Sequence, residues 1–183
     1  MATQSEVWQS AELDHPIAIA AVLSDGSAPI NAVLAELARR LAGEGRHIAG
    51  VLQLMPEGAP PTNCDMTLFV LPDGPRIGIS QALGQHATGC RLDHEALEEA
   101  AGLVDRSLEG GADVLIVNKF GKREGEGAGF RQTIARAVAL GIPVLVGIAE
   151  AELPSFESFV GDGADVLPAS LDHILAWYRA KQA

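Results

Sequence analysis

Positive charge is scarce in this chain: its 183 residues include 13 lysines and arginines against 24 aspartates and glutamates, a formal net charge of −11. A protein whose main ligand is a nucleic-acid backbone needs a broad basic face, so the composition predicts no nucleic-acid partner. No apolar run reaches the ~18 residues that a bilayer-spanning helix needs, and the first residues lack a basic region followed by an apolar core. We therefore expect a cytoplasmic protein without membrane insertion.

Cysteines and aromatic residues are also few. The two cysteines, Cys64 and Cys90, cannot form a disulfide scaffold, and in a reducing compartment we expect thiols. Aromatic residues make up 4% of the chain and apolar residues 48%, so alanine, valine, leucine and isoleucine must build the core, as in a buried parallel sheet flanked by helices. The length predicts a single domain over 15–183, preceded by an extension at 1–14.

Apolar runs and helical periodicities alternate along the chain. The predicted strands are 17–23, 48–54, 67–71, 76–80, 114–117, 143–148 and a short edge strand at 165–167. The predicted helices are 29–43, 93–108, 130–140, 153–160 and 171–181, with Ser27 or Ala28 capping the first and Asp93 the second. The fold class is therefore α/β: a mainly parallel, doubly wound sheet with a β-hairpin insertion that turns at 73–74.

The loop after the first strand occupies the place of a phosphate-binding P-loop, G-x-x-x-x-G-K-[ST]. Aligned on the strand end, Ser24 replaces the first glycine, Pro29 the second, Ile30 the lysine and Asn31 the magnesium-binding hydroxyl. Asp25, Gly26 and Ser27 can still offer backbone amides to an anion at a helix N-terminus. The same residues can equally form only a tight turn.

A second loop concentrates the scarce positive charge. Two of the three lysines, Lys119 and Lys122, follow the apolar run 114–117 in a glycine-rich segment. Open α/β sheets bind ligands beyond the carboxyl ends of their strands, so this cluster predicts an anionic ligand. The candidate ligand-binding residues of this loop are Asn118, Lys119, Gly121, Lys122 and Arg131, with Arg123 behind them. In the alternative interpretation the loop is only solvated, and its lysines pair with Glu124 and Glu126.

Two further features of this loop bear on chemistry. Glu124 and Glu126 are the candidate bases if the protein is an enzyme, and Glu124 is the preferred one. The run Asn118-Lys119-Phe120-Gly121 can be compared with the guanine-reading N-K-x-D motif, but Gly121 stands where the base-reading carboxylate would be. Guanine specificity is therefore not expected.

A third polar segment, 84–93, lies between the hairpin and the second helix. Cys90 precedes a helix N-terminus and adjoins Arg91, and both features favour a thiolate. If this segment faces the lysine loop, Cys90 and Arg91 would complete an oxyanion pocket; otherwise it is only a structural helix start. His86, Cys90, Asp93 and Cys64 include metal-ligand types without a metal-site spacing, so we predict no metal site.

The chain resembles the THEP-type nucleoside-triphosphatases, and more closely a related bacterial family of domains of unknown function. The motifs that carry the resemblance are GCRLD at 89–93, ADVLIVNKFGKRE at 112–124, EGAGFR at 126–131 and GIPVLVG at 141–147. The resemblance implies a three-layer fold like that of the P-loop NTPases and a link to molybdenum genes. THEP-type enzymes carry an acidic pair where this chain has Asn118 and Lys119, which argues against hydrolysis.

Together these features predict an accessory protein of molybdenum metabolism that binds a nucleotide, phosphate or molybdate-like oxyanion through a degenerate P-loop and the lysine loop. Two alternatives stay open. One is an active nucleoside triphosphatase that uses Lys119, Lys122 and the carboxylate of Glu124 or Asp113, with Mg²⁺ as cofactor. The other is a non-catalytic interaction module; a homodimer or a molybdenum-related protein partner is compatible with each.

Overall fold

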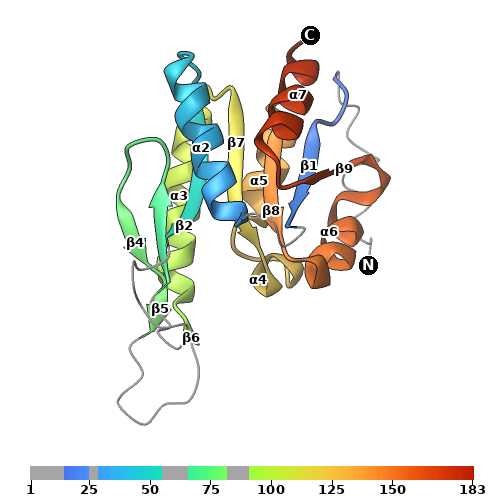
Figure 1. Ribbon diagram of the computed structural model, residues 1–183. Coiled ribbons are helices and arrows are strands. Elements are labelled where there is room, and N and C mark those ends of the chain that lie inside the picture. The colour runs from blue at the N-terminus through green and yellow to red at the C-terminus, as the bar shows by residue number, and fades with distance from the viewer. Residues whose placement is uncertain (1–14, 25–28, 55–65, 82–90) are drawn as a thin grey trace.

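The structure, a computed structural model, describes residues 15–24, 29–54, 66–81 and 91–183, apart from the side chains of Arg91 and Asp162 (Figure 1). Its strands are β1 (Ile19–Leu23), β2 (Ile48–Leu54), β3 (Thr67–Val70), β4 (Arg76–Gly78), β5 (Ser80–Gln81), β6 (Arg91–Leu92), β7 (Val114–Phe120), β8 (Val144–Ile148) and β9 (Asp165–Pro168). Seven of them form one sheet in the order β4-β3-β2-β7-β8-β1-β9, while β5 and β6 pair separately. β3 and β4 are antiparallel to their neighbours, and the other five strands are parallel.

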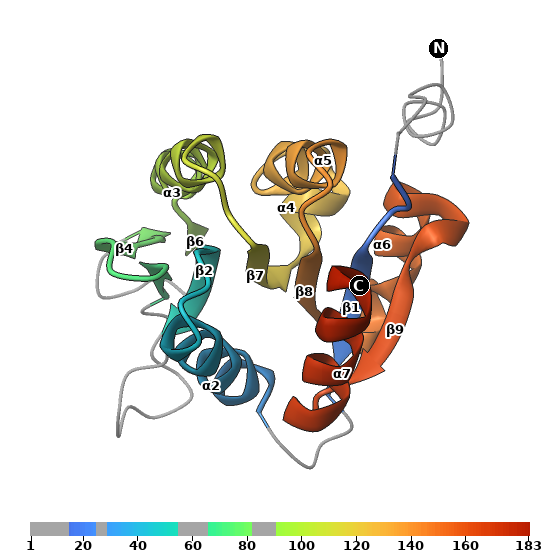
Figure 2. The same cartoon turned by 90° about the horizontal axis from the view of Figure 1, so that it is seen from above.

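Helices cover both faces of this sheet. They are α2 (Ile30–Gly43), α3 (His94–Glu109), α4 (Lys122–Gly125), α5 (Arg131–Ala139), α6 (Leu153–Val160) and α7 (Leu171–Gln182), with 3₁₀ turns at Glu150–Glu152 and Gly161–Gly163. Seen from above, α3 and α5 lie on one face, and α2 and α7 lie on the other (Figure 2). No helix in the described part of the chain is both long and apolar enough to cross a bilayer. The expected doubly wound α/β sheet with a hairpin insertion is confirmed.

The central strand β7 shows why a sheet poor in aromatic residues is stable here. Successive side chains of a strand point to opposite faces: Leu115 and Val117 pack under α3 and α5, whereas Val114 and Ile116 pack under α2 and α7. All four are fully buried. The strand is therefore apolar on both faces, as parallel strands covered by two helical layers are.

Several predicted boundaries were wrong by a few residues. The strand predicted at 114–117 continues to Phe120, so Asn118 and Lys119 belong to β7 rather than to a loop. Pro29 is the N-cap of α2 and makes no side-chain cap hydrogen bond, so neither Ser27 nor Ala28 is the cap. The glycine-rich loop contains the short helix α4, which the many glycines concealed. Asp93 caps α3 as predicted, with its Oδ1 3.1 Å from the amide nitrogen of Ala96.

An aromatic contact and a hydrogen bond hold the ends of the central and edge strands. The Phe120 ring lies edge-on to Phe156 of α6, with centroids 5.4 Å apart. At the edge of the sheet, Trp177 of α7 donates its indole N–H to Asp165 of β9 at 2.7 Å. Trp177 and Tyr178 are buried in the core under α7. Burial of Phe120 fixes the end of β7, and this end carries the candidate site.

Candidate functional site

The parallel strands bring the candidate residues together at one edge of the sheet. β1, β2, β7 and β8 all end there, and two cavities open beside the end of β7. The larger has a volume of about 310 Å³, and the smaller about 270 Å³. Asn118 and Lys119 line both cavities, so these two residues form the wall that the cavities share.

The smaller cavity lies beside the start of α2 and the ends of β1, β7 and β8. It is lined by Ser24, Ile30, Asn118, Lys119, Ile148, Ala149 and Glu150. Ser24 and Ile30 flank the first βα loop. The lining of this cavity contains one cationic residue, Lys119, and one acidic residue, Glu150. The predicted ligands Asp25, Gly26 and Ser27 lie outside the described residues.

Two asparagines connect the helix α2 to the central strand. Asn118 Nδ2 donates to Asn31 Oδ1 at 2.8 Å, and Asn31 Nδ2 donates to the carbonyl oxygen of Gln53. Asn118 is only 6% exposed. At Gly147 of β8 an added Cβ would lie 2.4 Å from Asn118 Oδ1 and 2.9 Å from Ile30. A glycine is therefore required beside this amide pair.

Lys119 follows Asn118 in the same strand. Its neighbours Asn118 and Phe120 are buried, and Lys119 itself is exposed. The regular alternation of β7 ends here, because its register against β8 shifts between Asn118 and Phe120. The ammonium group is thus held at the shared wall of the two cavities by a strand whose flanking side chains are fixed in the core.

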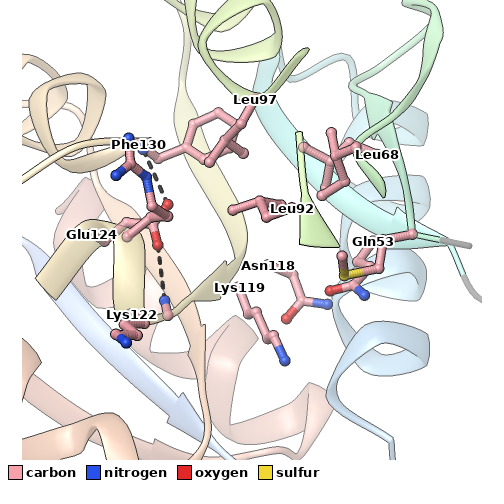
Figure 3. Close-up of a pocket in the computed structure, with 13 residues that line it drawn as sticks. Gln53, Leu68, Leu92, Leu97, Asn118, Lys119, Lys122, Glu124 and Phe130 are labelled. Carbon is pink, nitrogen blue, oxygen red and sulfur yellow. Dashed lines mark hydrogen bonds between the residues drawn. The ribbon is translucent and has the colours of Figure 1, made fainter. Parts of the chain in front are cut away.

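Glu124 holds the lysine loop closed. Its Oε2 accepts the Gly121 N–H at 3.0 Å, and its Oε1 accepts the Phe130 N–H at 3.2 Å, as the dashed lines in Figure 3 show. The side chain is 4% exposed. Burial raises the pKa of Glu124, while these hydrogen bonds and the Arg123 charge oppose the rise. Glu124 was predicted as a candidate base; the structure also gives it a structural role, because both carboxylate oxygens accept backbone N–H groups.

The other end of the loop is anchored by a glycine and an arginine. Gly129 has a φ of +59°, and a Cβ there would lie 2.3 Å from Glu124 Oε1. The Gly129 N–H donates to Glu98 of α3 at 3.0 Å. Arg131 donates to the Glu124 carbonyl oxygen at 3.0 Å and lies 4.3 Å above the Phe159 ring. Arg131, predicted as a ligand-binding residue, thus contacts the loop and α6, and it is not among the residues that line either cavity.

The two remaining cations of the loop, Lys122 and Arg123, both line the larger cavity and form ion pairs. They approach Glu126 at 3.8 Å and 3.7 Å, respectively. The expected pairing of a lysine with Glu126 is confirmed for Lys122. Exposed ion pairs of this kind contribute little to stability, so both cations remain available to a ligand.

The predicted segment around Cys90 is described only from Arg91 onward. Cys90 and Cys64 lie outside the described residues, and the backbone of Arg91 pairs with Gln81 in the small sheet. Leu92 lines the larger cavity together with Lys119 and Lys122. The described end of this segment, at Leu92, therefore faces the lysine loop.

The sequence interpretation missed the apolar part of the larger cavity. Its apolar lining comprises Met66, Leu68, Ile79, Leu92, Leu97 and Phe130. Burial alternates along β3, but its sequence, Thr67-Leu-Phe-Val70, does not alternate apolar and polar residues, so it gave no signal for the inward-facing Leu68. The other positions come from separate elements. Asp113, one alternative catalytic carboxylate, precedes β7 and accepts the His47 N–H at 2.7 Å. It lies at the opposite edge of the sheet from Lys119, so its proposed catalytic role is wrong.

No cluster of three histidine, cysteine or acidic side chains that could hold a metal ion occurs among the described residues. The amide pair at the end of β7 is uncharged, and hard divalent cations prefer carboxylate oxygens. The chemistry that the described groups offer is therefore charge recognition by ammonium and guanidinium groups next to an apolar wall.

This sheet order defines an α/β protein with a P-loop NTPase-like fold. Two solved structures share the fold: THEP1 from the hyperthermophile Aquifex aeolicus (TM-score 0.59, 11% identity, 88% of this chain and 95% of that one) and a human cancer-related nucleoside triphosphatase (TM-score 0.60, 16% identity, 87% and 94%). The chain belongs to the family described as protein of unknown function DUF2478, whose model matches residues 19–177.

One curated relative extends this comparison. The molybdenum import ATP-binding protein ModC 2 of Bradyrhizobium diazoefficiens is 33% identical over 169 residues, which are 92% of this chain. The match spans only 19% of the length of that protein. The resemblance to THEP-type proteins that the sequence motifs indicated is confirmed.

Glu124→Ala is expected to destabilise the protein by about 2–4 kcal/mol, because it removes two hydrogen bonds and leaves the buried Phe130 N–H without its acceptor. The raised pKa means that the folded state binds the proton of Glu124 more tightly than the unfolded state does. The stabilisation by Glu124 is therefore full below the unfolded pKa and declines as the pH rises through the folded pKa. Urea unfolding at several pH values measures both effects.

Glu126→Ala is the matched control in the same loop, since Glu126 makes only the long ion pairs with Lys122 and Arg123. We expect this variant to lose less than about 0.5 kcal/mol. Equal losses in the two variants, or a loss in Glu124→Ala that grows with pH, would contradict the role assigned to Glu124.

Proposed function

We propose that this protein binds a small anionic ligand, a nucleotide, phosphate or molybdate-like oxyanion, at the carboxyl edge of its sheet. The observation that carries the proposal is the position of Lys119, an exposed ammonium group in the shared wall of two cavities. Strand ends of open α/β sheets are the usual ligand sites of this fold class. Lys122 adds a second cation at the same edge.

The hydrogen-bonded amides of Asn31 and Asn118 suggest which group neutralises the negative charge of such a ligand. In P-loop NTPases, Mg²⁺ is held by a Ser or Thr hydroxyl of the loop and a carboxylate at a strand end. In this chain Asn31 stands at the first position, and Asn118 at the end of β7 bonds to it directly. We propose that the ammonium group of Lys119 supplies the positive charge that Mg²⁺ supplies elsewhere, and that the protein binds without hydrolysing.

The relative named for molybdenum import supports a role in molybdenum metabolism. We propose that the chain acts there as an accessory protein in the cytoplasm, alone, as a homodimer or with a molybdenum-related partner. Molybdate is a tetrahedral dianion like phosphate, so the same cationic edge suits both anions.

Lys119→Ala together with Lys122→Ala should weaken anion binding and leave the fold intact, because both side chains are exposed and supply charge rather than packing. Each charge-assisted contact is worth about 1.5–3 kcal/mol, so the affinity should fall roughly 10-fold or more per lysine. Isothermal titration with phosphate, molybdate and ADP measures the affinity, and thermal melting reports the fold and the stabilisation by bound ligand.

Lys181→Ala is the matched control. This third lysine lies in the last turn of α7 and pairs with Asp165 at 3.2 Å. It should leave every affinity unchanged. If none of the three probes binds the wild-type chain, or if the double variant binds as tightly as the wild type does, the proposal fails; the first result would favour an interaction module.

Magnesium-dependent hydrolysis of ATP and GTP should be absent, because the P-loop lysine is replaced by Ile30 and the strand-end carboxylate by Asn118. Phosphate release measured with purified protein and excess Mg²⁺ tests this expectation. Turnover of about 1 per second or faster, lost in Glu124→Gln but retained in Glu126→Gln, would establish the alternative, an active triphosphatase.

A further inference from the structure

We propose that the larger cavity is a binding site for a two-ring aromatic or heteroaromatic group that carries an anionic substituent. The proposed function requires only the charged edge of the sheet and the smaller cavity. This inference goes beyond it and assigns a chemical class of organic ligand to a second site.

The apolar wall excludes an inorganic oxyanion as the sole occupant. Six apolar side chains from the hairpin, β6, α3 and the start of α5 surround the cavity, among them Leu68, Leu92 and Leu97. An oxyanion that filled this space would lose water and gain no hydrogen bonds from these side chains. The wall favours an occupant with an apolar surface of its own.

The volume limits the size of that occupant. Engineered apolar cavities of about 150 Å³ accept benzene, and this cavity is close to twice as large, at about 310 Å³. Two fused rings therefore fit, while a whole dinucleotide does not. The side-chain amides of Gln53 and Asn118 also line the cavity and can reach ring nitrogen or oxygen atoms.

Polar and apolar groups are separated within the cavity. In Figure 3 Leu68, Leu97 and Phe130 lie in the upper half of the view, whereas Asn118, Lys119 and Lys122 lie in the lower half. A ligand with one apolar and one charged end matches this separation. Its anionic group would lie at Lys119, on the boundary with the smaller cavity.

Arg123 adds a third cation to this cavity. It lines the cavity together with Lys119 and Lys122, and its guanidinium group lies 3.7 Å from Glu126. A ligand with an anionic group at this end of the cavity would be attracted by all three cations.

Titration of the full chain with 1-naphthyl phosphate, phenyl phosphate and inorganic phosphate tests the inference. The three probes share one charged group and differ in ring size. We expect 1-naphthyl phosphate to bind about 30-fold more tightly than inorganic phosphate or better, because its rings leave water. Phenyl phosphate should fall between them.

Leu92→Trp fills the cavity and should remove the preference for the naphthyl ring, while leaving the affinity for inorganic phosphate unchanged. Met66→Trp fills the cavity from another wall, and this variant replaces Leu92→Trp in the test if Leu92→Trp does not fold. Leu140→Trp is the matched control, since Leu140 is 55% exposed and follows α5 at the opposite edge of the sheet.

The outcomes separate this inference from the proposed function. If 1-naphthyl phosphate binds no more tightly than inorganic phosphate, or if neither Leu92→Trp nor Met66→Trp weakens it relative to Leu140→Trp, the inference is wrong even where phosphate binds. If 1-naphthyl phosphate binds and depends on Leu92 while phosphate, molybdate and ADP do not bind, the inference stands and the proposed function fails.

Discussion

The hydrogen bond between Asn118 and Asn31 is the interaction on which the site depends. It joins the end of the central strand to the first turn of α2 at 2.8 Å, and Asn31 in turn bonds to the carbonyl oxygen of Gln53 in β2. Asn118 and Phe120 are both buried, and Lys119 between them is the exposed residue at the end of β7. Gly147 of β8 leaves the space that the amide pair requires.

A second set of contacts shapes the loop that follows. Glu124 binds the N–H groups at both ends of the turn, and Arg131 binds the carbonyl group of Glu124 from α5. Glu124 lines the larger cavity together with three cations, Lys119, Lys122 and Arg123, but its carboxylate accepts backbone N–H groups of the loop. This explains how a chain with a net charge of −11 can present a local positive edge. Charge placement, rather than net charge, decides which ligand the site attracts.

The sequence predicted the layers of the fold well, because its apolar runs and helical periodicities are uninterrupted in the core. It predicted less about the site. The apolar run ends at Val117, so the sequence placed the end of β7 too early. The strand continues through the polar residues Asn118 and Lys119 to Phe120. Arg131 and Glu124 are both charged residues of a glycine-rich segment, so the sequence suggested a ligand-binding or catalytic role for each. Their hydrogen bonds within the loop are visible only in the structure. The apolar cavity arises from elements far apart in sequence, such as Met66 and Leu97, so no local pattern encodes it.

The most direct test of this account is the effect of Mg²⁺ on anion affinity. Phosphate binding would be measured by titration calorimetry in the presence of EDTA and again with excess Mg²⁺. If Lys119 supplies the neutralising charge, the two dissociation constants should agree within about threefold. If phosphate binds only when Mg²⁺ is present, a metal ion is held at the amide pair after all, and the role assigned to Lys119 is contradicted.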